Sequence, residues 1–192
     1  MNSIIVNSAN LGCYGSLYHE HLKHRHQRFV TEKKWDIPHN ANVEQDQYDR
    51  HDSVYVLVEL NGDLVGYARM LRTDKLVVYG YHTFSYMVRD ASLGLLPGIE
   101  RDLLDGSPAP SDPTIWEMTR FHALDRSVMK EIFRAAAYHI KNNGGTSTIS
   151  YTRKSYKTIL NRIGFPTQII GPVYTHAEDG MEYCVLRSSL IQ

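Results

Sequence analysis

The stretch Trp116-Glu117-Met118-Thr119-Arg120-Phe121 determines most of what this sequence predicts. It lies inside an apolar run from Ile115 to Leu124, which we expect to form a strand of the core. Charged side chains are costly to bury unless they form ion pairs or act on a ligand. An acid and an arginine on a core strand therefore indicate a functional site.

A second polar segment, Glu44-Gln45-Asp46-Gln47-Tyr48-Asp49, precedes that strand. It lies in a stretch over residues 35–52 that Pro38 and the polar residues 39–42 make irregular, so we expect a loop. A loop of this length in a compact domain is often functional. Asp46 and Asp49 of this loop are the second set of candidate site residues.

The composition indicates an ordinary globular protein. A chain of 192 residues suits a single domain over residues 1–192, and 21 basic residues against 21 acidic ones give no basic field for nucleic acid. Two cysteines without a CxxC pair favour a reducing compartment. No apolar stretch is long enough for a signal peptide or a membrane span. We therefore expect a cytoplasmic protein with neither a membrane nor a nucleic-acid partner.

Strands and helices follow one another in an order that predicts the fold class. The runs 54–60 and 64–70 flank Asn61-Gly62-Asp63, which is typical of a hairpin. A helix capped by Ser127 should end at Asn142-Asn143-Gly144-Gly145, and residues 75–112 should be irregular with short helical pieces. The remaining expected elements are strands at 4–6, 115–124, 146–150, 168–170 and 182–187, and helices at 16–31 and 155–163. This order predicts an α/β (α+β) fold with a mixed sheet flanked by helices.

Four blocks of the sequence together resemble the acyl-homoserine-lactone synthases, the bacterial autoinducer synthases, over about residues 17–165. The family's first block consists of an arginine, an aromatic residue and a tryptophan, which correspond here to Arg25, Phe29 and Trp35. Its second block, Glu-x-Asp-x-Tyr/Phe-Asp, corresponds to residues 44–49. Arg69 matches the hairpin arginine, and residues 116–121 match the last block in full. Any one block is weak, but four in the right order are specific.

The resemblance implies a GNAT-like acyltransferase fold and a defined reaction. S-adenosylmethionine would be the amine substrate, an acyl-acyl carrier protein or acyl-CoA the donor, and no cofactor would be needed. The family forms an amide and then a lactone, and releases methylthioadenosine. By position in the family, Glu117 is the catalytic candidate. The implied substrate-binding residues are Arg25, Phe29, Trp35, Asp46, Asp49, Arg69, Phe84, Thr119, Arg120, Phe121 and Ser150.

Each role has a plain structural alternative. The substrate amine must lose a proton, and apolar neighbours could make Glu117 a suitable base, or else it is the structural partner of an arginine. Phe29 and Trp35 offer ring faces to the sulfonium or the adenine. The three arginines could hold the substrate carboxylate, or brace the loop of Asp46 and Asp49. In a regular strand Glu117 and Arg120 lie on opposite faces and meet only across a bulge.

Two further features bear on the donor. Ser150 ends the predicted strand where the family often has a threonine for 3-oxo acyl chains, although an ordinary serine would fit there too. A basic patch could dock an acidic carrier protein, or could be a solvated helix face. It consists of Arg153, Lys154, Lys157 and Arg162. No glycine-rich cradle for a pyrophosphate is present, which favours a carrier protein over CoA.

Several points stay open or are excluded. The segment between Thr73 and Leu103 is longer than in most relatives, so the family's phenylalanine position falls on Phe84 or, in a second register, on Glu100. We choose Phe84. The histidines at 19, 21, 24 and 26 lie on several helix faces, so no metal site is expected. The alternatives to a lactone synthase are an N-acyl amino acid synthase and a non-catalytic ligand-binding relative.

Overall fold

The computed structural model describes residues 1–177 and 179–190. The chain forms two compact units, one of Met1–Leu71 with Arg120–His139 and one of Arg72–Thr119 with Ile140–Gln192. The expectation of a single domain over residues 1–192 is not tested by this division. Within the described part of the chain, no helix combines the length and the apolar character needed to cross a membrane.

The first unit is built on an antiparallel arrangement of β1 (Asn2–Val6), β4 (Val54–Leu60) and β5 (Asp63–Arg72), with β4 in the middle. The predicted hairpin is confirmed. Asn61 and Gly62 both have positive φ, +56° and +93°, as a tight turn between twisted strands requires. The C-terminal half of β8 (Ile115–Ala123) follows β5, since the Leu124 N–H donates to the Val65 carbonyl.

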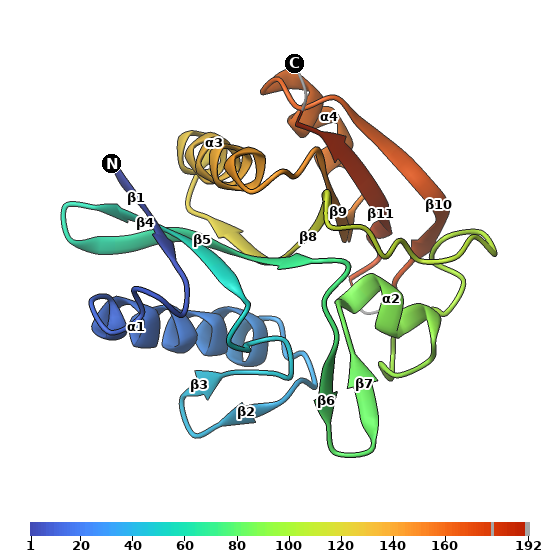
Figure 1. The fold of residues 1–192 in the computed structure, drawn as a ribbon, viewed down its shortest axis with the longest axis horizontal. Coiled ribbons are helices and arrows are strands. Elements are labelled where there is room, and N and C mark those ends of the chain that lie inside the picture. The colour runs from blue at the N-terminus through green and yellow to red at the C-terminus, as the bar shows by residue number, and fades with distance from the viewer. Residues whose placement is uncertain (178, 191–192) are drawn as a thin grey trace. The chain divides into compact units, whose positions relative to one another are not determined.

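Helices cover both faces of these strands (Figure 1). On one face α1 (Gly15–Arg25) and the π-helix η1 (His26–Glu32) pack through Leu17, Tyr18 and Phe29 onto Tyr55, Leu57 and Tyr67. On the other face lies α3 (Arg126–Asn142), whose Val128 and Ile132 come so close to Gly66 that a Cβ there would lie 2.5 Å from Val128. Gly66 therefore sets the distance between β5 and α3. The short strands β2 (His39–Asn40) and β3 (Val43–Glu44) complete this unit.

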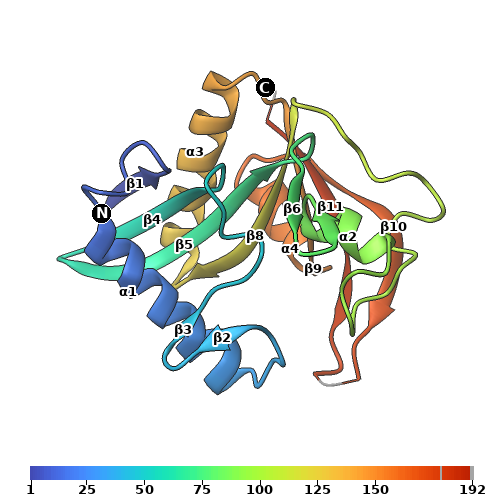
Figure 2. The ribbon, with the colours of Figure 1, turned by 60° about the horizontal axis from the view of Figure 1, so that its bottom comes forward.

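The second unit carries the mixed pairing that the element order predicted. The N-terminal half of β8 runs parallel to β9 (Ser147–Arg153), which pairs antiparallel with β11 (Glu182–Ser189), and β11 with β10 (Thr167–Thr175). The helices of this unit are α2 (Met87–Ser92) and α4 (Tyr156–Arg162). Figure 2 shows that α2 lies beside β9. The same view shows the long ribbon formed by β10 and β11.

Three local expectations are wrong, each for a physical reason. The segment 75–112, expected to be irregular with short helical pieces, does contain the short helix 87–92, but it also contains a hairpin of β6 (Val77–Tyr79) and β7 (His82–Phe84), whose turn is made by Gly80 at a φ of +61°. The strand expected to end at Ser150 continues to Arg153, because β11 pairs with it throughout. The cap of α3 is Asp125, whose carboxylate accepts the N–H groups of Ser127 and Val128.

The helix expected over residues 16–31 changes type on the way. It is an α-helix to Arg25 and a π-helix from His26 to Glu32. A π-turn holds more residues than an α-turn, so it rotates the following side chains out of α-helical register, and such turns occur frequently at functional sites. Phe29 lies within this turn and is buried. Hydrophobic spacing along the sequence does not reveal such a change.

Candidate functional site

The motif residues of the first unit form one buried network of ion pairs. Arg25 comes from the last turn of α1 and is fully buried. Its Nε donates to Glu44 at 2.6 Å, and its two Nη atoms donate to the two oxygens of Asp49 at 2.7 and 2.9 Å. This is the fork-to-fork geometry in which arginine binds a carboxylate most strongly. Arg25 therefore ties the loop of residues 44–49 to the helix.

Arg69 and Arg120 complete the network. Arg69, on β5, donates to both oxygens of Asp46 at 2.6 and 3.2 Å and lies 3.0 Å from Asp49. Arg120, on β8, donates to Glu44 through Nε at 3.1 Å and to Asp46 through Nη2 at 2.8 Å. Three guanidinium groups thus face three carboxylates. The arginines are thus paired with carboxylates of the loop, as the bracing alternative predicted. For Arg120, Glu44 takes the place of the expected partner Asp49.

Burial and pairing act in opposite directions on these charges. Burial alone disfavours the charged form of Asp49, yet Arg69 and Arg25 hold its pKa well below the usual value. Burial likewise opposes the charge on Arg69, and Asp46 and Asp49 more than offset it, so that the pKa of Arg69 is raised. Asp49 and Arg69 therefore stay ionised at neutral pH. Removing one partner would leave a charge buried and unpaired.

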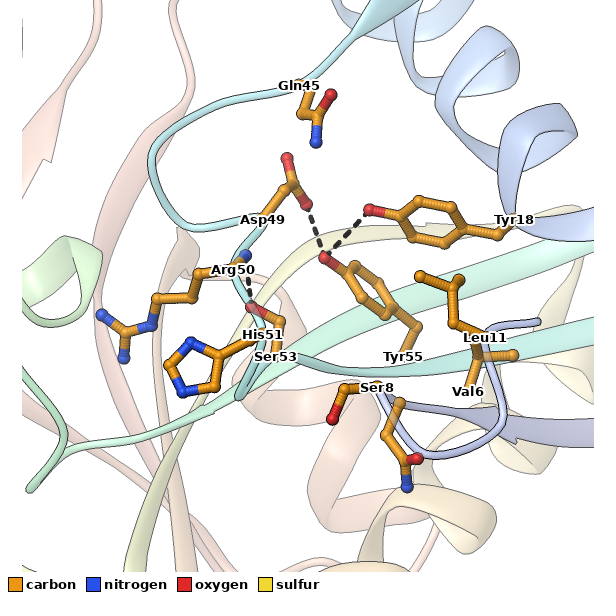
Figure 3. Close-up of a pocket in the computed structure, with 11 residues that line it drawn as sticks. Val6, Ser8, Leu11, Tyr18, Gln45, Asp49, Arg50, His51, Ser53 and Tyr55 are labelled. Atoms are coloured by element: carbon orange, nitrogen blue, oxygen red, sulfur yellow. Dashed lines mark hydrogen bonds between the residues drawn. The ribbon is translucent and has the colours of Figure 1, made fainter. Parts of the chain in front are cut away.

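Two tyrosines extend the network toward a small cavity (Figure 3). Tyr55 Oη donates to Asp49 at 2.9 Å, and Tyr18 Oη donates to Tyr55 at 3.3 Å. The two tyrosines line a cavity of about 230 Å³ that Gln45 and His51 also line, and only the Tyr55 hydroxyl reaches Asp49 directly. Sequence reasoning missed Glu44 and Tyr55 as site residues. Glu44 could have been found, since it opens the acidic motif, whereas nothing distinguishes Tyr55 from other strand tyrosines.

The predicted aromatic residues form a stacked pair. The rings of Phe29 and Trp35 lie 5.2 Å apart with an interplanar angle of 11°. The ammonium of Lys33 lies 4.3 Å from the Trp35 centroid and 5.2 Å from that of Phe29. The guanidinium carbon of Arg120 lies 5.6 Å from the centroid of the Phe29 ring. The pair therefore already attracts cations within the chain.

Glu117 belongs to the second unit and is fully buried. Its Oε2 accepts the N–H of Met87 and its Oε1 accepts the N–H of Val88, both at 2.8 Å. These two amides open α2, and the first N–H groups of a helix have no acceptor within it. At Arg120 the β8 backbone takes a φ of +49°, outside regular strand geometry. Glu117 and Arg120 thus have separate partners.

The remaining predicted residues occupy different places. Phe84 ends β7 and is buried, while its alternative Glu100 is partly exposed and accepts the hydroxyl of Tyr151 at 3.1 Å, so burial favours Phe84 as the family phenylalanine. Thr119 is buried within β8, and Phe121 packs against Phe133 of α3. Ser150 lies in mid-strand opposite Leu186 and not at a strand end. Substrate contact by these residues stays a prediction.

The predicted basic patch is only partly a helix face. Arg153 is on β9 and pairs with Asp179 at 2.9 Å, and Lys154 pairs with Glu182 at 3.0 Å. Lys157 and Arg162 are exposed on α4. Two of the four positive charges are thus partly compensated by acids of the same unit. Docking of a carrier protein here stays a prediction.

Metal-ligand spacing occurs once among the described residues, in the group Glu44, Asp46 and Asp49, whose ligand atoms lie within 4.8 Å of one another. The arginines described above bind these oxygens. The helix histidines point elsewhere: His21 packs edge-on against Tyr67, and His24 lies 4.8 Å from His122. The acidic group is therefore built to hold guanidinium groups.

Comparison with known proteins identifies the family. The model of the family described as "Autoinducer synthase" matches residues 14–179 of this chain. The acyl-homoserine-lactone synthase of Ralstonia nicotianae is 31% identical over 166 residues, which are 78% of this chain and 72% of that protein. The acyl-homoserine-lactone synthase of Acinetobacter nosocomialis is 28% identical over 184 residues, 88% of this chain and 91% of that protein.

Solved structures agree on the fold. BjaI, a CoA-dependent acyl-homoserine lactone synthase solved with SAM and isopentyl-CoA, superposes with a TM-score of 0.78 at 19% identity, over 98% of this chain and 82% of that one. An acyl-CoA N-acyltransferase from Pseudomonas aeruginosa superposes with a TM-score of 0.59 at 16% identity, over 97% and 99%. The predicted acyltransferase fold is confirmed. With the match over residues 14–179, these findings place the chain in the autoinducer synthase family.

Proposed function

We propose that this protein is an acyl-homoserine-lactone synthase, with S-adenosylmethionine as amine substrate and an acyl thioester as donor. The observation that carries the proposal is the convergence of the first three motif blocks and Arg120 in one place. Arg25, Asp46, Asp49 and Arg69 are separated along the chain but share hydrogen bonds at 2.6 to 3.2 Å. Buried charges are costly unless they are paired, and here their pairing brings three motif blocks and Arg120 together.

The reaction consists of two displacements. The substrate amine, once it has lost a proton, attacks the thioester carbon; the carbon–sulfur bond breaks and the carrier leaves as its thiol, so that an amide forms. A carboxylate oxygen of the same molecule then attacks the carbon next to the sulfonium. That carbon–sulfur bond breaks, the lactone closes, and neutral methylthioadenosine leaves with the electron pair. No further cofactor takes part.

The stacked rings of Phe29 and Trp35 suit the sulfonium. A cation over an aromatic face gains on the order of 1 kcal/mol at a partly exposed site. The Lys33 ammonium lies over both rings and stands in for such a cation. The three network arginines are already occupied by protein carboxylates, which favours their ordering of the 44–49 loop. Lactonisation needs a carboxylate that can move, so a rigid arginine clamp on the substrate would hinder it.

The donor is an acyl-acyl carrier protein or an acyl-CoA. Lys157 and Arg162, exposed on α4, offer positive charge to an acidic carrier protein. Both kinds of donor occur in the cytoplasm, and the described cysteines, Cys13 and Cys184, are free thiols, as in a reducing compartment. We therefore infer a cytoplasmic location.

The experiment is incubation of the purified chain with S-adenosylmethionine and acyl donors of graded length, on carrier protein and on CoA. Mass spectrometry should detect methylthioadenosine together with an acyl-homoserine lactone. An N-acyl amino acid synthase, the second candidate, would release the thiol and an open-chain amide without methylthioadenosine. If no donor yields methylthioadenosine, the synthase assignment is wrong.

A further inference from the structure

The contacts of Glu117 differ from those expected of a general base. Both of its oxygens accept backbone N–H groups at 2.8 Å, from Met87 and Val88, and its side chain is fully buried. Hydrogen bonds donated to a carboxylate stabilise its ionised form. A base must bind the proton it removes, so the same bonds weaken Glu117 in that role. They also direct both oxygens toward α2.

The helix that Glu117 holds cannot stand alone. α2 is six residues long, well below the length at which an isolated helix is stable in water. Its N-cap residue, Tyr86, makes no side-chain cap hydrogen bond, so the Glu117 carboxylate takes the place of a cap. Without Glu117, the N–H groups of Met87 and Val88 would have to find other acceptors.

Phe84 precedes this anchored turn, and Ser85 lies between the two. The Ser85 N–H donates to Asp90 at 2.9 Å, and the Ser85 hydroxyl donates to the carbonyl of Lys75 at 2.6 Å. Residues 84–90 are therefore fixed to the rest of the unit at two points, through Ser85 to the Lys75 carbonyl and through Met87 and Val88 to Glu117. A shift of the first turn of α2 would move Phe84, which the resemblance implies as a substrate-binding residue.

We propose that Glu117 is a positioning residue, which anchors the first turn of α2 and so holds Phe84 in place at the substrate site, and that it does not remove the proton of the substrate amine. This inference rests on the proposed synthase function.

The first test uses pH to separate the two roles. An α-amino group loses its proton near pH 8, so at about pH 9 most of the substrate amine no longer needs a base. For Glu117→Gln we expect kcat/KM to fall roughly 10- to 100-fold, by a factor that is the same at about pH 7 and about pH 9. A loss that shrinks tenfold or more at the higher pH would overturn the inference. Absence of methylthioadenosine with the unaltered chain would instead refute the synthase function.

The second test leaves the Glu117 carboxylate in place. Met87→Pro removes one of the two N–H donors, at a helix position where proline is well tolerated, after a residue that is already extended. Met87→Ala is the matched control, because it shortens the same side chain and keeps the N–H. We expect Met87→Pro to lower kcat/KM at least fivefold relative to Met87→Ala. Equal activity of the two variants would show that the anchor is not needed and would overturn the inference.

A third measurement tests the route through Phe84. If Glu117 acts through Phe84, the double variant Glu117→Gln/Phe84→Ala should lose hardly more activity than the more damaging single variant. Fully multiplicative losses would contradict this route. Asp112→Asn serves as a control: Asp112 also accepts a backbone N–H, from Thr114 at 2.7 Å, but lies outside the 84–90 segment, so the variant should keep its activity.

Discussion

Arg25 illustrates how one side chain can order a functional loop. It is fully buried and reaches Glu44 and Asp49 with three of its nitrogens. Lysine cannot reproduce this fork of donors. We expect Arg25→Lys to lower the free energy of unfolding by about 3 kcal/mol, because it leaves buried carboxylate oxygens unpaired.

Urea denaturation measures this loss, and the chain offers a matched control. Arg28, one helical turn further, pairs with Glu32 on the exposed surface. Arg28→Lys should change the free energy of unfolding by less than about 0.5 kcal/mol. Similar losses in both variants would mean that the network contributes no more than a surface ion pair.

The site residues show where sequence reasoning succeeds and where it stops. The motifs placed Arg25, Asp46, Asp49 and Arg69 in one site, and the structure brings them together. Which arginine pairs with which carboxylate depends on three-dimensional geometry, however. The sequence therefore could not predict that Arg120 would form an ion pair with Glu44. The two amide partners of Glu117 were equally invisible, because backbone N–H groups carry no sequence signature.

At the scale of elements, local chemistry explains which predictions succeed. The hairpin of β4 and β5 follows from Asn61-Gly62, since both residues adopt positive φ readily. The turn at Gly80 and the π-turn around Phe29 were missed, because neither changes the pattern of apolar residues enough. The extension of β9 to Arg153 depends on pairing with a strand some thirty residues away.

The start of α3 provides a test at this scale. Asp125 Oδ1 accepts the N–H of Ser127 at 2.8 Å and that of Val128 at 2.9 Å, while Ser127 Oγ only donates to Asp125. We expect Asp125→Ala to lower the melting temperature measurably, because the helix loses its N-cap. Ser127→Ala should lower it clearly less in the same thermal unfolding experiment. A larger loss for Ser127→Ala would restore Ser127 as the cap.

At the scale of the whole molecule, stability should depend on pH through buried histidines. Burial, together with His24, lowers the pKa of His122 to about 4, and burial also lowers the pKa of His21 and of His24. The folded pKa lies below the unfolded value, so the unfolded chain binds more protons. The stabilisation is complete above pH 6.5 and is lost as pH falls from about 6.5 to about 4.

Denaturation at about pH 7 and about pH 4.5 checks this dependence. His122 is only partly buried, so we expect its share to be roughly 1 to 2 kcal/mol. His122→Asn should therefore flatten the fall in unfolding free energy by about that amount, whereas the exposed His19→Asn should leave it unchanged. An unaltered slope for His122→Asn would show that its ring is not held neutral.

Family membership could be predicted because four short blocks occur in the right order along the chain, which chance rarely produces. The acyl group could not, because its length and oxidation depend on the volume of a pocket lined by many side chains. The choice between carrier protein and CoA depends on surface charge, and acids such as Asp179 and Glu182 alter that charge in ways the basic patch alone does not reveal.

The most direct test of the proposed function is the stoichiometry of products in a single reaction. When the protein is given S-adenosylmethionine and an acyl donor that it accepts, we expect the free thiol, methylthioadenosine and the acyl-homoserine lactone in equal molar amounts. One chain carries out both displacements. Thiol released without methylthioadenosine, or methylthioadenosine formed without lactone, would contradict it.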